Sequence, residues 1–561
     1  MRQPSQVLPE KIISMSSHTG TAVIFYKNNQ RFEISWTDYQ KQIGKTALAL
    51  QKLGLKKGSR IAIHANSCLE WLLLDFASQL IKLVTVPIYS SSTAAEVTHI
   101  LNDSESEVLF TDQKSLHLQT QKKCEKLKLI IDITTSEWEQ FLAIKQNQDF
   151  DFQSKIVYEK KDLATLVYTS GTTGLPKGVC ITQEQIQSEV VEAFEWAMTS
   201  LDRTLSFLPL SHILGRVEIW AHLYWGSTIA IAEKIEKLRD HLQDVKPTLL
   251  VSVPRIFEKF YESILSQMET FGLKRKVFHW ALEVGKEVSF YRLAKRKVPL
   301  ELALKNKLAD ELVFSKIRNL FGGQLRFAIS GGAPLSKEIA EFFYFCGVLI
   351  LEGYGLTETT AAITVNRDYD YKIGTVGKPI GDVQIKIAAD GEILIKSKKV
   401  MTEYYNLPAE TESAFEKGWF KTGDIGEVLP SGELIITDRK KDLIKTSGGK
   451  YVAPQKLETL LKESPMISQA LVLGDQRKYV VALLQVDQQL HQDKNSAVIK
   501  EAIRSQVAKV NAELASFESI KKFEITFDTW TVEGGELTPS LKLKRKKLIE
   551  KYQLTIDEMY D

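Results

Sequence analysis

Residues 168–179 of this chain read Tyr168-Thr169-Ser170-Gly171-Thr172-Thr173-Gly174-Leu175-Pro176-Lys177-Gly178-Val179. An apolar, β-branched run at residues 163–167 comes just before this stretch and predicts a buried strand. Residues 182–185 form a capping box, which predicts a helix that continues to Trp196. Glycines let backbone N–H groups turn inward, and hydroxyl groups add further donors. A loop of this composition suits a polyphosphate.

The spacing within this loop differs from that of a Walker A loop, in which the lysine follows a glycine and precedes Ser or Thr. Here Lys177 follows Pro176 and precedes Gly178. A glycine-rich surface turn is the simpler interpretation, but the density of glycines and hydroxyls around one lysine disfavours it. The residues resemble the phosphate-binding signature of the AMP-forming adenylating enzymes, the superfamily of acyl-CoA synthetases, luciferases and adenylation domains. This resemblance implies that Thr172 also contacts a metal ion and that the β- and γ-phosphates of ATP are bound by Thr169, Ser170, Gly171, Thr172, Thr173, Gly174 and Lys177.

Length, charge and cysteine spacing limit the class of protein. A chain of 561 residues is too long for one compact core and predicts several domains. The formal net charge of +3 is too close to neutral to indicate a nucleic-acid partner. The cysteines lie far apart, which is typical of a reducing compartment and not of a zinc site. The start of the chain lacks the apolar core of a signal peptide, and no segment has the ~20 apolar residues of a membrane span, so we expect a cytoplasmic protein.

The first part of the chain alternates between helical and strand-like patterns. Residues 35–55 and 66–83 predict helices, whereas residues 61–63 and 84–89 predict strands. This alternation favours an α/β fold with a mostly parallel sheet covered by helices. The resemblance implies a large N-terminal domain, residues 1–437, of helix-covered β-sheets plus a β-rich subdomain. It also implies a small mobile α+β domain, residues 438–561, that moves about a hinge at Asp438.

Two motifs concern the acyl substrate. A histidine beside an apolar stretch is usually structural, but the position of His212 coincides with a superfamily motif, which implies that it lines the acyl pocket. Some bacterial relatives carry a tryptophan gate to the acyl tunnel where this chain has Arg216, so the gate stays unassigned. Residues 253–259, Val-Pro-Arg-Ile-Phe-Glu-Lys, resemble an element of the long-chain fatty acid group. That element implies a substrate class and not only a superfamily.

Two glycine-containing turns follow apolar, strand-like runs and complete the expected nucleotide site. The resemblance implies that Tyr354 offers a flat stacking surface and that the adenine lies between Gly332, Ala333 and Pro334 on one side and Gly353, Tyr354 and Gly355 on the other. Thr357 is implied to touch the α-phosphate and Glu358 to hold Mg²⁺, which prefers one or two carboxylates together with phosphate oxygens. Asp424 can accept hydrogen bonds from both ribose hydroxyls.

The last part of the chain combines one departure from the family with several matches. Lys396-Ser397 and Glu403 stand where the family has Arg-Gly and Gly, which leaves the conformation of residues 396–403 open. Residues 438–450 match the hinge and the loop after it, so Arg439 is implied to reach the ribose and Lys445 to serve the thioester step. Residues 456–483 and 499–527 predict a small α+β domain, and Lys542 occupies the position of the family's adenylation lysine.

Residues 274–307 are strongly basic, with ten Lys or Arg against three Glu. Aromatic and aliphatic residues interleave with these cations. A solvated helical face is the simpler interpretation. The alternative is a basic amphipathic surface in peripheral contact with an anionic membrane, where each cation contributes ~1 kcal/mol. That contact would place the protein at the inner face of a membrane.

These motifs together imply an AMP-forming acyl-CoA synthetase. It would use ATP and Mg²⁺ to convert a medium- to long-chain fatty acid to acyl-AMP, and would then transfer the acyl group to CoA. Cations and N–H donors stabilise the charge that builds up on the phosphates, so no nucleophilic side chain is required. Three alternatives stay open: an acyl-AMP ligase that loads a carrier protein, an aryl or amino acid activator, and a non-enzymatic lipid-associated scaffold.

Overall fold

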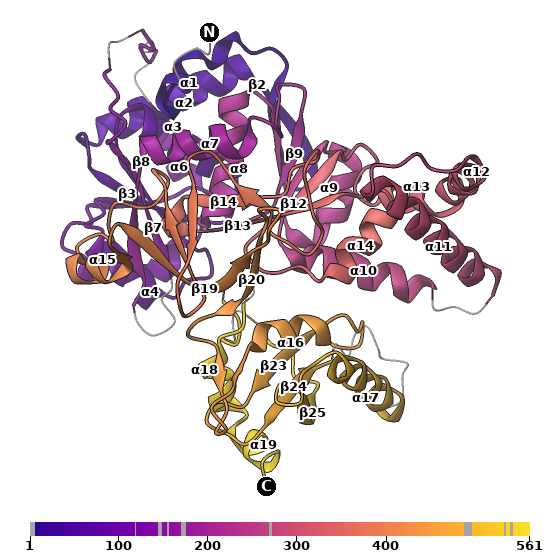
Figure 1. Ribbon diagram of the computed structural model, residues 1–561. Coiled ribbons are helices and arrows are strands. Elements are labelled where there is room, and N and C mark those ends of the chain that lie inside the picture. Colours follow the sequence, from indigo (N-terminus) through magenta and orange to yellow (C-terminus); the bar gives the residue numbers. More distant parts are fainter. Residues whose placement is uncertain are drawn as a thin grey trace.

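The structure is a computed structural model that describes residues 6–117, 119–143, 149–153, 156–169, 175–268, 272–486, 496–531, 534–538 and 542–561. Residues 170–174 of the expected phosphate loop, Ser170 and Thr172 among them, therefore lie outside the described residues. The chain folds into a large α/β part and a smaller C-terminal unit, which carries the yellow end of the ribbon in Figure 1.

A six-stranded sheet carries the phosphate-type loop. Its order is β6-β5-β3-β4-β7-β8, and all neighbours are parallel except β7 and β8. The strands are β3 (Arg60–His64), β4 (Val84–Ile88), β5 (Val108–Thr111), β6 (Leu129–Asp132), β7 (Leu163–Thr169) and β8 (Lys177–Thr182). The parallel sheet was predicted, but β8 was not, because the periodicity indicated only a helix after the loop.

Helices predicted from the sequence cover this sheet. They are α2 (Trp36–Lys52), α3 (Leu69–Leu80) and α7 (Gln183–Phe194). The capping box of α7 is present, since the Thr182 N–H donates to Gln185 Oε1 at 2.6 Å. The Ser35 hydroxyl caps α2 in the same way by accepting from the Asp38 N–H at 3.1 Å.

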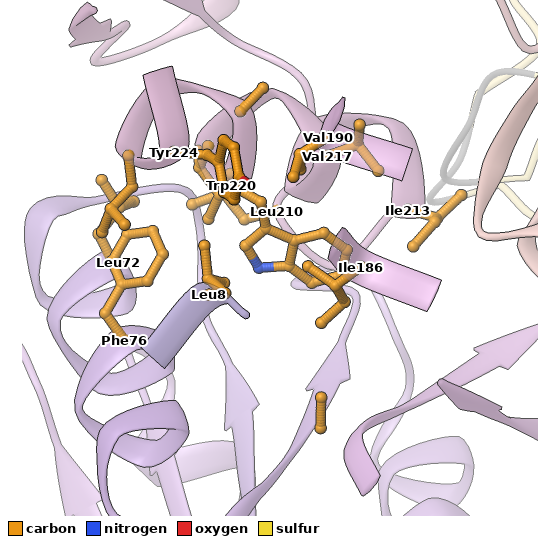
Figure 2. Close-up of a cluster of buried hydrophobic side chains, with 14 of the residues drawn as sticks. Leu8, Leu72, Phe76, Ile186, Val190, Leu210, Ile213, Val217, Trp220 and Tyr224 are labelled. Carbon is orange, nitrogen blue, oxygen red and sulfur yellow. The ribbon is translucent and has the colours of Figure 1, made fainter. Parts of the chain in front are cut away.

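Two further sheets complete the large part. One has the order β2-β1-β10-β9, with β1 (Thr21–Lys27), β2 (Gln30–Ser35), β9 (Arg203–Ser206) and β10 (Thr228–Ile231). The other has the order β11-β12-β13-β14-β15, with β11 (Leu249–Ser252), β12 (Phe327–Ser330), β13 (Ile350–Leu356), β14 (Ala361–Val365) and β15 (Lys378–Pro379). Figure 2 shows part of the core, where Leu72, Phe76 and Ile186 from α3 and α7 surround Trp220 of α8 (Ile213–Trp225).

A smaller sheet and the C-terminal unit follow. The sheet contains β16 (Gln384–Ile387), β17 (Glu392–Lys396), β18 (Phe415–Glu416), β19 (Trp419–Val428) and β20 (Leu434–Arg439). The C-terminal unit has its own core around β23 (Gln469–Leu473), β24 (Val480–Gln485), β25 (Ile520–Thr526), α16 (Pro454–Leu461) and α17 (Ser496–Ala512). Asp438 lies on the last strand before that unit, and the boundary there stays a prediction.

The basic region forms a helical hairpin, α11 (Leu273–Leu293) and α12 (Leu300–Ala309), which projects from the side of the large part (Figure 1). Helices α10 (Pro254–Met268) and α14 (Lys337–Phe345) lie between this hairpin and the C-terminal unit in the same view. Among the described residues, no helix combines the length and apolar character needed to span a membrane.

Candidate active site

The hairpin of β7 and β8 carries the expected phosphate loop at its tip. Thr169 pairs with Lys177 where the loop leaves the sheet. The Lys177 ammonium lies 5.4 Å from the centre of the Tyr404 ring, and the Tyr404 hydroxyl donates to Glu358 Oε1 at 2.8 Å. Tyr404 thus joins the loop lysine to the expected Mg²⁺ ligand. The sequence analysis missed this tyrosine because its role depends on contacts between distant segments.

Residues 396–405, whose conformation the sequence left open, lie against both halves of this arrangement. The Met401 N–H donates to the Glu358 carbonyl at 2.7 Å. On the other side, the Tyr405 N–H donates to the Gly178 carbonyl of β8 at 2.7 Å. The carbonyl of Glu403 accepts from a further β8 N–H at 3.1 Å. The departures from the family pattern are therefore compatible with a loop that bridges β8 and the turn after β13.

The expected adenine residues follow the end of β12 and lie in the second half of its parallel neighbour β13, where β13 pairs with β14. Gly332 has a φ of +83°, a left-handed conformation that favours glycine. A Cβ on Gly331 would lie 3.6 Å from the Gly353 carbonyl oxygen, so the two turns are adjacent. A Cβ on Gly355 would lie 1.4 Å from the Ala361 carbonyl oxygen, which excludes every other residue there. Ala333 and Pro334 continue the exposed side of the first turn.

Tyr354, Asp424 and Arg439 meet at the edge of this region. The Tyr354 hydroxyl donates to Asp424 Oδ2 at 2.5 Å, while Asp424 Oδ1 lies 3.2 Å from Arg439 Nε. Burial, with the Asp424 charge, raises the pKa of Tyr354 well above its ordinary value, so the phenol stays a donor. Since the Tyr354 side chain is buried, its hydrogen bond holds the Asp424 carboxylate in one orientation. This carboxylate is the group expected to bind the ribose. The stacking role of Tyr354 stays a prediction.

Lys542 reaches this group from the C-terminal unit. Its side chain is open to solvent but stands among many protein atoms, and this desolvation, together with the positive charges of Arg439 and Lys441, lowers its pKa to about 8. The Asp424 charge acts in the opposite direction. The Lys542 charge also contributes to lowering the pKa of His212 on the large part. The charges of Asp424 and Arg439 thus act on Lys542, and the Lys542 charge acts in turn on His212.

His212 caps the N-terminus of α8. Its Nδ1 accepts a hydrogen bond from the Leu214 N–H at 3.2 Å, which leaves Nε2 as the protonated nitrogen. Burial first, and the Lys542 charge second, lower the His212 pKa to about 4, so the imidazole is neutral at pH 7. Its ring lies 6.4 Å from the Tyr89 ring in an edge-on arrangement. A neutral ring of this kind is compatible with the predicted pocket wall.

Two expected catalytic residues lie apart from one another. Thr357 begins a short turn after β13 together with Glu358. Lys445 is exposed on the two-residue strand β21 (Ile444–Lys445) of the C-terminal unit, whereas Ile444 is buried. The Lys445 N–H donates to Asp475 Oδ1 at 3.0 Å and its ammonium lies 5.6 Å from the Tyr451 ring centre, and both partners belong to the same unit. Within the described part of the chain, the contacts of Lys445 thus stay inside the C-terminal unit and do not join it to the group around Lys542.

Arg216, which stands where some bacterial relatives carry the tryptophan gate to the acyl tunnel, is a residue of the protein core. Arg216 is fully buried, forms an ion pair with Asp75, and donates to Thr165 Oγ1 at 2.5 Å. Its guanidinium lies 4.7 Å and 5.4 Å from the ring centres of Trp220 and Trp71. Arg216 therefore holds α8 against the six-stranded sheet. The sequence analysis did not identify this pair, because neither residue reveals its partner.

The motif at residues 253–259 contacts the C-terminal unit. Arg255 Nη1 lies 3.2 Å from Glu258 and 3.4 Å from Glu262, all on α10. Glu258 in turn pairs at 3.2 Å with Lys462, which directly follows α16. Next to this pair, the Ser336 hydroxyl donates to Glu463 at 2.9 Å. The motif that was assigned to substrate class thus also takes part in the contact between the two units.

Comparisons with known proteins identify the family of the chain. Residues 15–405 match the AMP-binding enzyme family, and residues 441–561 match the AMP-binding enzyme C-terminal domain. The chain is 36% identical over 559 residues to a long-chain-fatty-acid–CoA ligase of Mycobacterium bovis, covering 94% of this chain and 93% of the relative. It is 32% identical over 587 residues to long chain acyl-CoA synthetase 1 of Arabidopsis thaliana, covering 94% and 87%. The adenylation domain of a carboxylate reductase from Mycobacterium chelonae superposes with a TM-score of 0.80 at 21% identity, covering 100% of this chain and 92% of that one.

Proposed function

The chain belongs to the AMP-binding enzyme family, and from this premise we propose that it activates medium- to long-chain fatty acids with ATP and transfers them to CoA. The coarser description, an AMP-forming ligase that uses ATP and CoA, follows from the family itself. The chain-length class is supported by its long-chain relatives in two kingdoms of life and by the motif at residues 253–259.

The observation that carries the proposal is the position of Lys542. A carboxylate is a poor electrophile, and adenylation converts one of its oxygens into a good leaving group. Negative charge builds up on the α-phosphate and on the departing pyrophosphate during this step, and preorganised cations stabilise it. The charges of Asp424 and Arg439, the expected ribose contacts, both act on Lys542, which supports a position for this lysine near the α-phosphate. Lys177 and Thr357 would supply further contacts to the phosphates.

Mg²⁺ fits the residues present. Magnesium is bound by one or two carboxylates together with phosphate oxygens and water, and Glu358 provides such a carboxylate close to Lys177. We assign Glu358, with Thr172 of the loop, as the protein ligands. When bound, the ion would neutralise part of the phosphate charge. Tyr404 would orient the Glu358 carboxylate through its hydroxyl.

Thioester formation would use a second arrangement of the C-terminal unit. Asp438 is buried and accepts from the Arg439 N–H at 2.6 Å and from the Gln455 N–H of α16 at 3.0 Å. One side chain therefore connects the last strand of the large part to the first helix of the C-terminal unit. This supports Asp438 as the hinge, about which rotation would withdraw Lys542 and bring Lys445 inward.

The test is pyrophosphate exchange across a panel of carboxylic acids. We expect exchange that depends on fatty acids of medium to long chain, and exchange limited to aryl or amino acids would contradict the proposal. The acceptor is tested separately by supplying CoA or a carrier protein to the acyl-AMP formed. Transfer to the carrier protein but not to CoA would favour an acyl-AMP ligase instead.

A further inference from the structure

Helix α12 and the segment after it expose leucines at regular helical spacing. The exposed fractions are 79% for Leu300, 63% for Leu304, 49% for Leu308 and 42% for Leu312. Residues four apart in a helix lie on one face, so these leucines form a continuous stripe. We name these four residues the leucine stripe. A stripe of large aliphatic side chains in contact with water marks an interaction site more often than a single exposed leucine does.

The leucine stripe is not the face by which α12 packs on the protein. That face carries Leu302, Ala309 and Val313, which are buried in the core shared with α11 and α14. Helix α12 is therefore apolar on two opposite sides, although its packing on the protein requires only one. The hairpin projects from the large part (Figure 1), and the leucine stripe lies outside the core that α12 shares with α11 and α14.

The end of α11 extends the apolar surface. Phe290 and Leu293 are both largely exposed there. A groove of about 410 Å³ between the two helices is lined by Phe290, Tyr291, Pro299 and Leu302 together with the charged Glu287, Glu301 and Lys305. Aromatic and aliphatic side chains next to a shallow groove suit partial insertion among lipid headgroups.

Positive charge surrounds this apolar surface. Exposed cations on the hairpin and its connecting turn are Lys286, Arg292, Lys295, Arg296, Lys297, Lys305 and Lys307. Of these, Lys305 pairs with Glu301 at 2.7 Å. The other acidic side chains of residues 280–314 are Glu283, Glu287, Asp310 and Glu311, and Asp310 pairs with Arg318 at 2.6 Å, so the net charge is still positive. The positive charge of the hairpin is complementary to anionic phospholipid. The chain as a whole is close to neutral, with a formal net charge of +3.

We propose that the α11–α12 hairpin docks on the surface of a bilayer that contains anionic phospholipid. The leucine stripe and Phe290 enter the boundary between headgroups and acyl chains, while the lysines and arginines contact phosphates. Apolar burial and electrostatic attraction then add to one another, as in other helices that lie in the membrane interface. The docking goes beyond the proposed catalytic function and does not depend on it.

The test is co-sedimentation of the full chain with vesicles of phosphatidylcholine alone or mixed with phosphatidylglycerol. We expect binding to the mixed vesicles that weakens with salt. The double variant Leu304→Ser/Leu308→Ser should lower the affinity roughly tenfold, because membrane affinity scales with buried apolar area. The double variant Lys295→Glu/Lys297→Glu should remove the preference for phosphatidylglycerol.

The matched control is Leu201→Ser/Leu554→Ser, since these leucines are 91% and 82% exposed but lie outside the hairpin. It should bind vesicles as the unmodified chain does. All variants should retain pyrophosphate exchange with a short, soluble acid, which separates docking from catalysis. Failure of the unmodified chain to bind the mixed vesicles, or equal binding by Leu304→Ser/Leu308→Ser, would overturn the proposal. So would a dimer that the same double variant converts to monomer without vesicle binding.

Discussion

Lys542 is a cation held in an environment that disfavours its charge. Desolvation and the neighbouring cations Arg439 and Lys441 lower its pKa to about 8, and only Asp424 acts in the other direction. An arriving triphosphate would supply the missing negative charge. The Lys542 ammonium should therefore be stabilised more by the charge that develops on the phosphates than by its surroundings in the free enzyme. Catalysis by differential binding requires such a difference.

The substitution Lys542→Ala tests this role. It should lower pyrophosphate exchange by roughly 10²-fold or more, the effect of removing one preorganised donor from a transition state. The same variant should still convert supplied acyl-AMP and CoA to thioester, because the proposed rotation about Asp438 would withdraw Lys542 for that step. Lys546→Ala, which removes an exposed lysine from the same segment, serves as the control. Equal losses in both half-reactions would refute the division of roles.

At the scale of an element, α8 shows how a helix can be polar in sequence and still buried. Arg216, Glu218 and His222 are all fully buried on it. Burial raises the pKa of Glu218 to about 7 and lowers that of His222 to about 3, so the histidine is uncharged and the carboxyl is easily neutralised. Arg216 keeps its charge because Asp75 of α3 neutralises it.

Substitutions at the two residues of the ion pair between α3 and α8 should have strongly non-additive effects on the free energy of unfolding. Asp75→Leu or Arg216→Met alone leaves one buried charge without its partner, which costs about 3–5 kcal/mol. The double variant removes both charges and should be destabilised by less than the sum of the single variants. The apparent Tm of the full chain measures this difference.

The control for this cycle is the pair Arg504–Glu501, whose side chains are mostly exposed. Arg504→Met should change the apparent Tm little, because exposed ion pairs contribute little to stability. Tm shifts of the single variants at Asp75 and Arg216 that add up fully in the double variant would show that the pair is not coupled.

Helices and strands could be predicted where the residues that determine them lie close together in the sequence. The cap at Ser35 and the capping box at Thr182 could be located because each acts within one turn of its helix. The link from Lys177 through Tyr404 to Glu358 could not, because it depends on backbone pairing between β8 and residues 403–405, which lie more than two hundred residues apart in the chain. Five residues of the expected phosphate loop, 170–174, stay predictions since they lie outside the described part of the chain.

At the scale of the molecule, the contacts between the two units decide whether Lys542 is present in the site. Lys462 and Glu463 follow α16, and they meet Glu258 of α10 and Ser336 at the start of α14. The sequence predicted a mobile C-terminal domain, but the contacts depend on how the two units pack and have no local signal.

Glu463 should make this arrangement depend on pH. Burial first, and then the charge of Glu338, raise its pKa from 4.5 to about 7, while the Ser336 hydroxyl and Lys509 at 3.8 Å act in the opposite direction. Lys509 also pairs with Glu338 at 3.4 Å, and the Tyr261 hydroxyl faces Glu338 as well. A pKa that is higher in this arrangement than in a separated one means that protonation favours this arrangement. Its population should therefore fall, by at most about tenfold per pH unit, as the pH rises from 4.5 to about 7.

Energy transfer between dyes attached to the large part and to the C-terminal unit would follow this population across that range of pH. Glu463→Gln should remove most of the pH response, because the amide stays neutral and can still accept from Ser336. Lys462→Met breaks the pair with Glu258 and should lower the population at every pH without changing the slope. A slope that persists unchanged in Glu463→Gln would assign the pH response to other groups and leave Glu463 a purely structural contact.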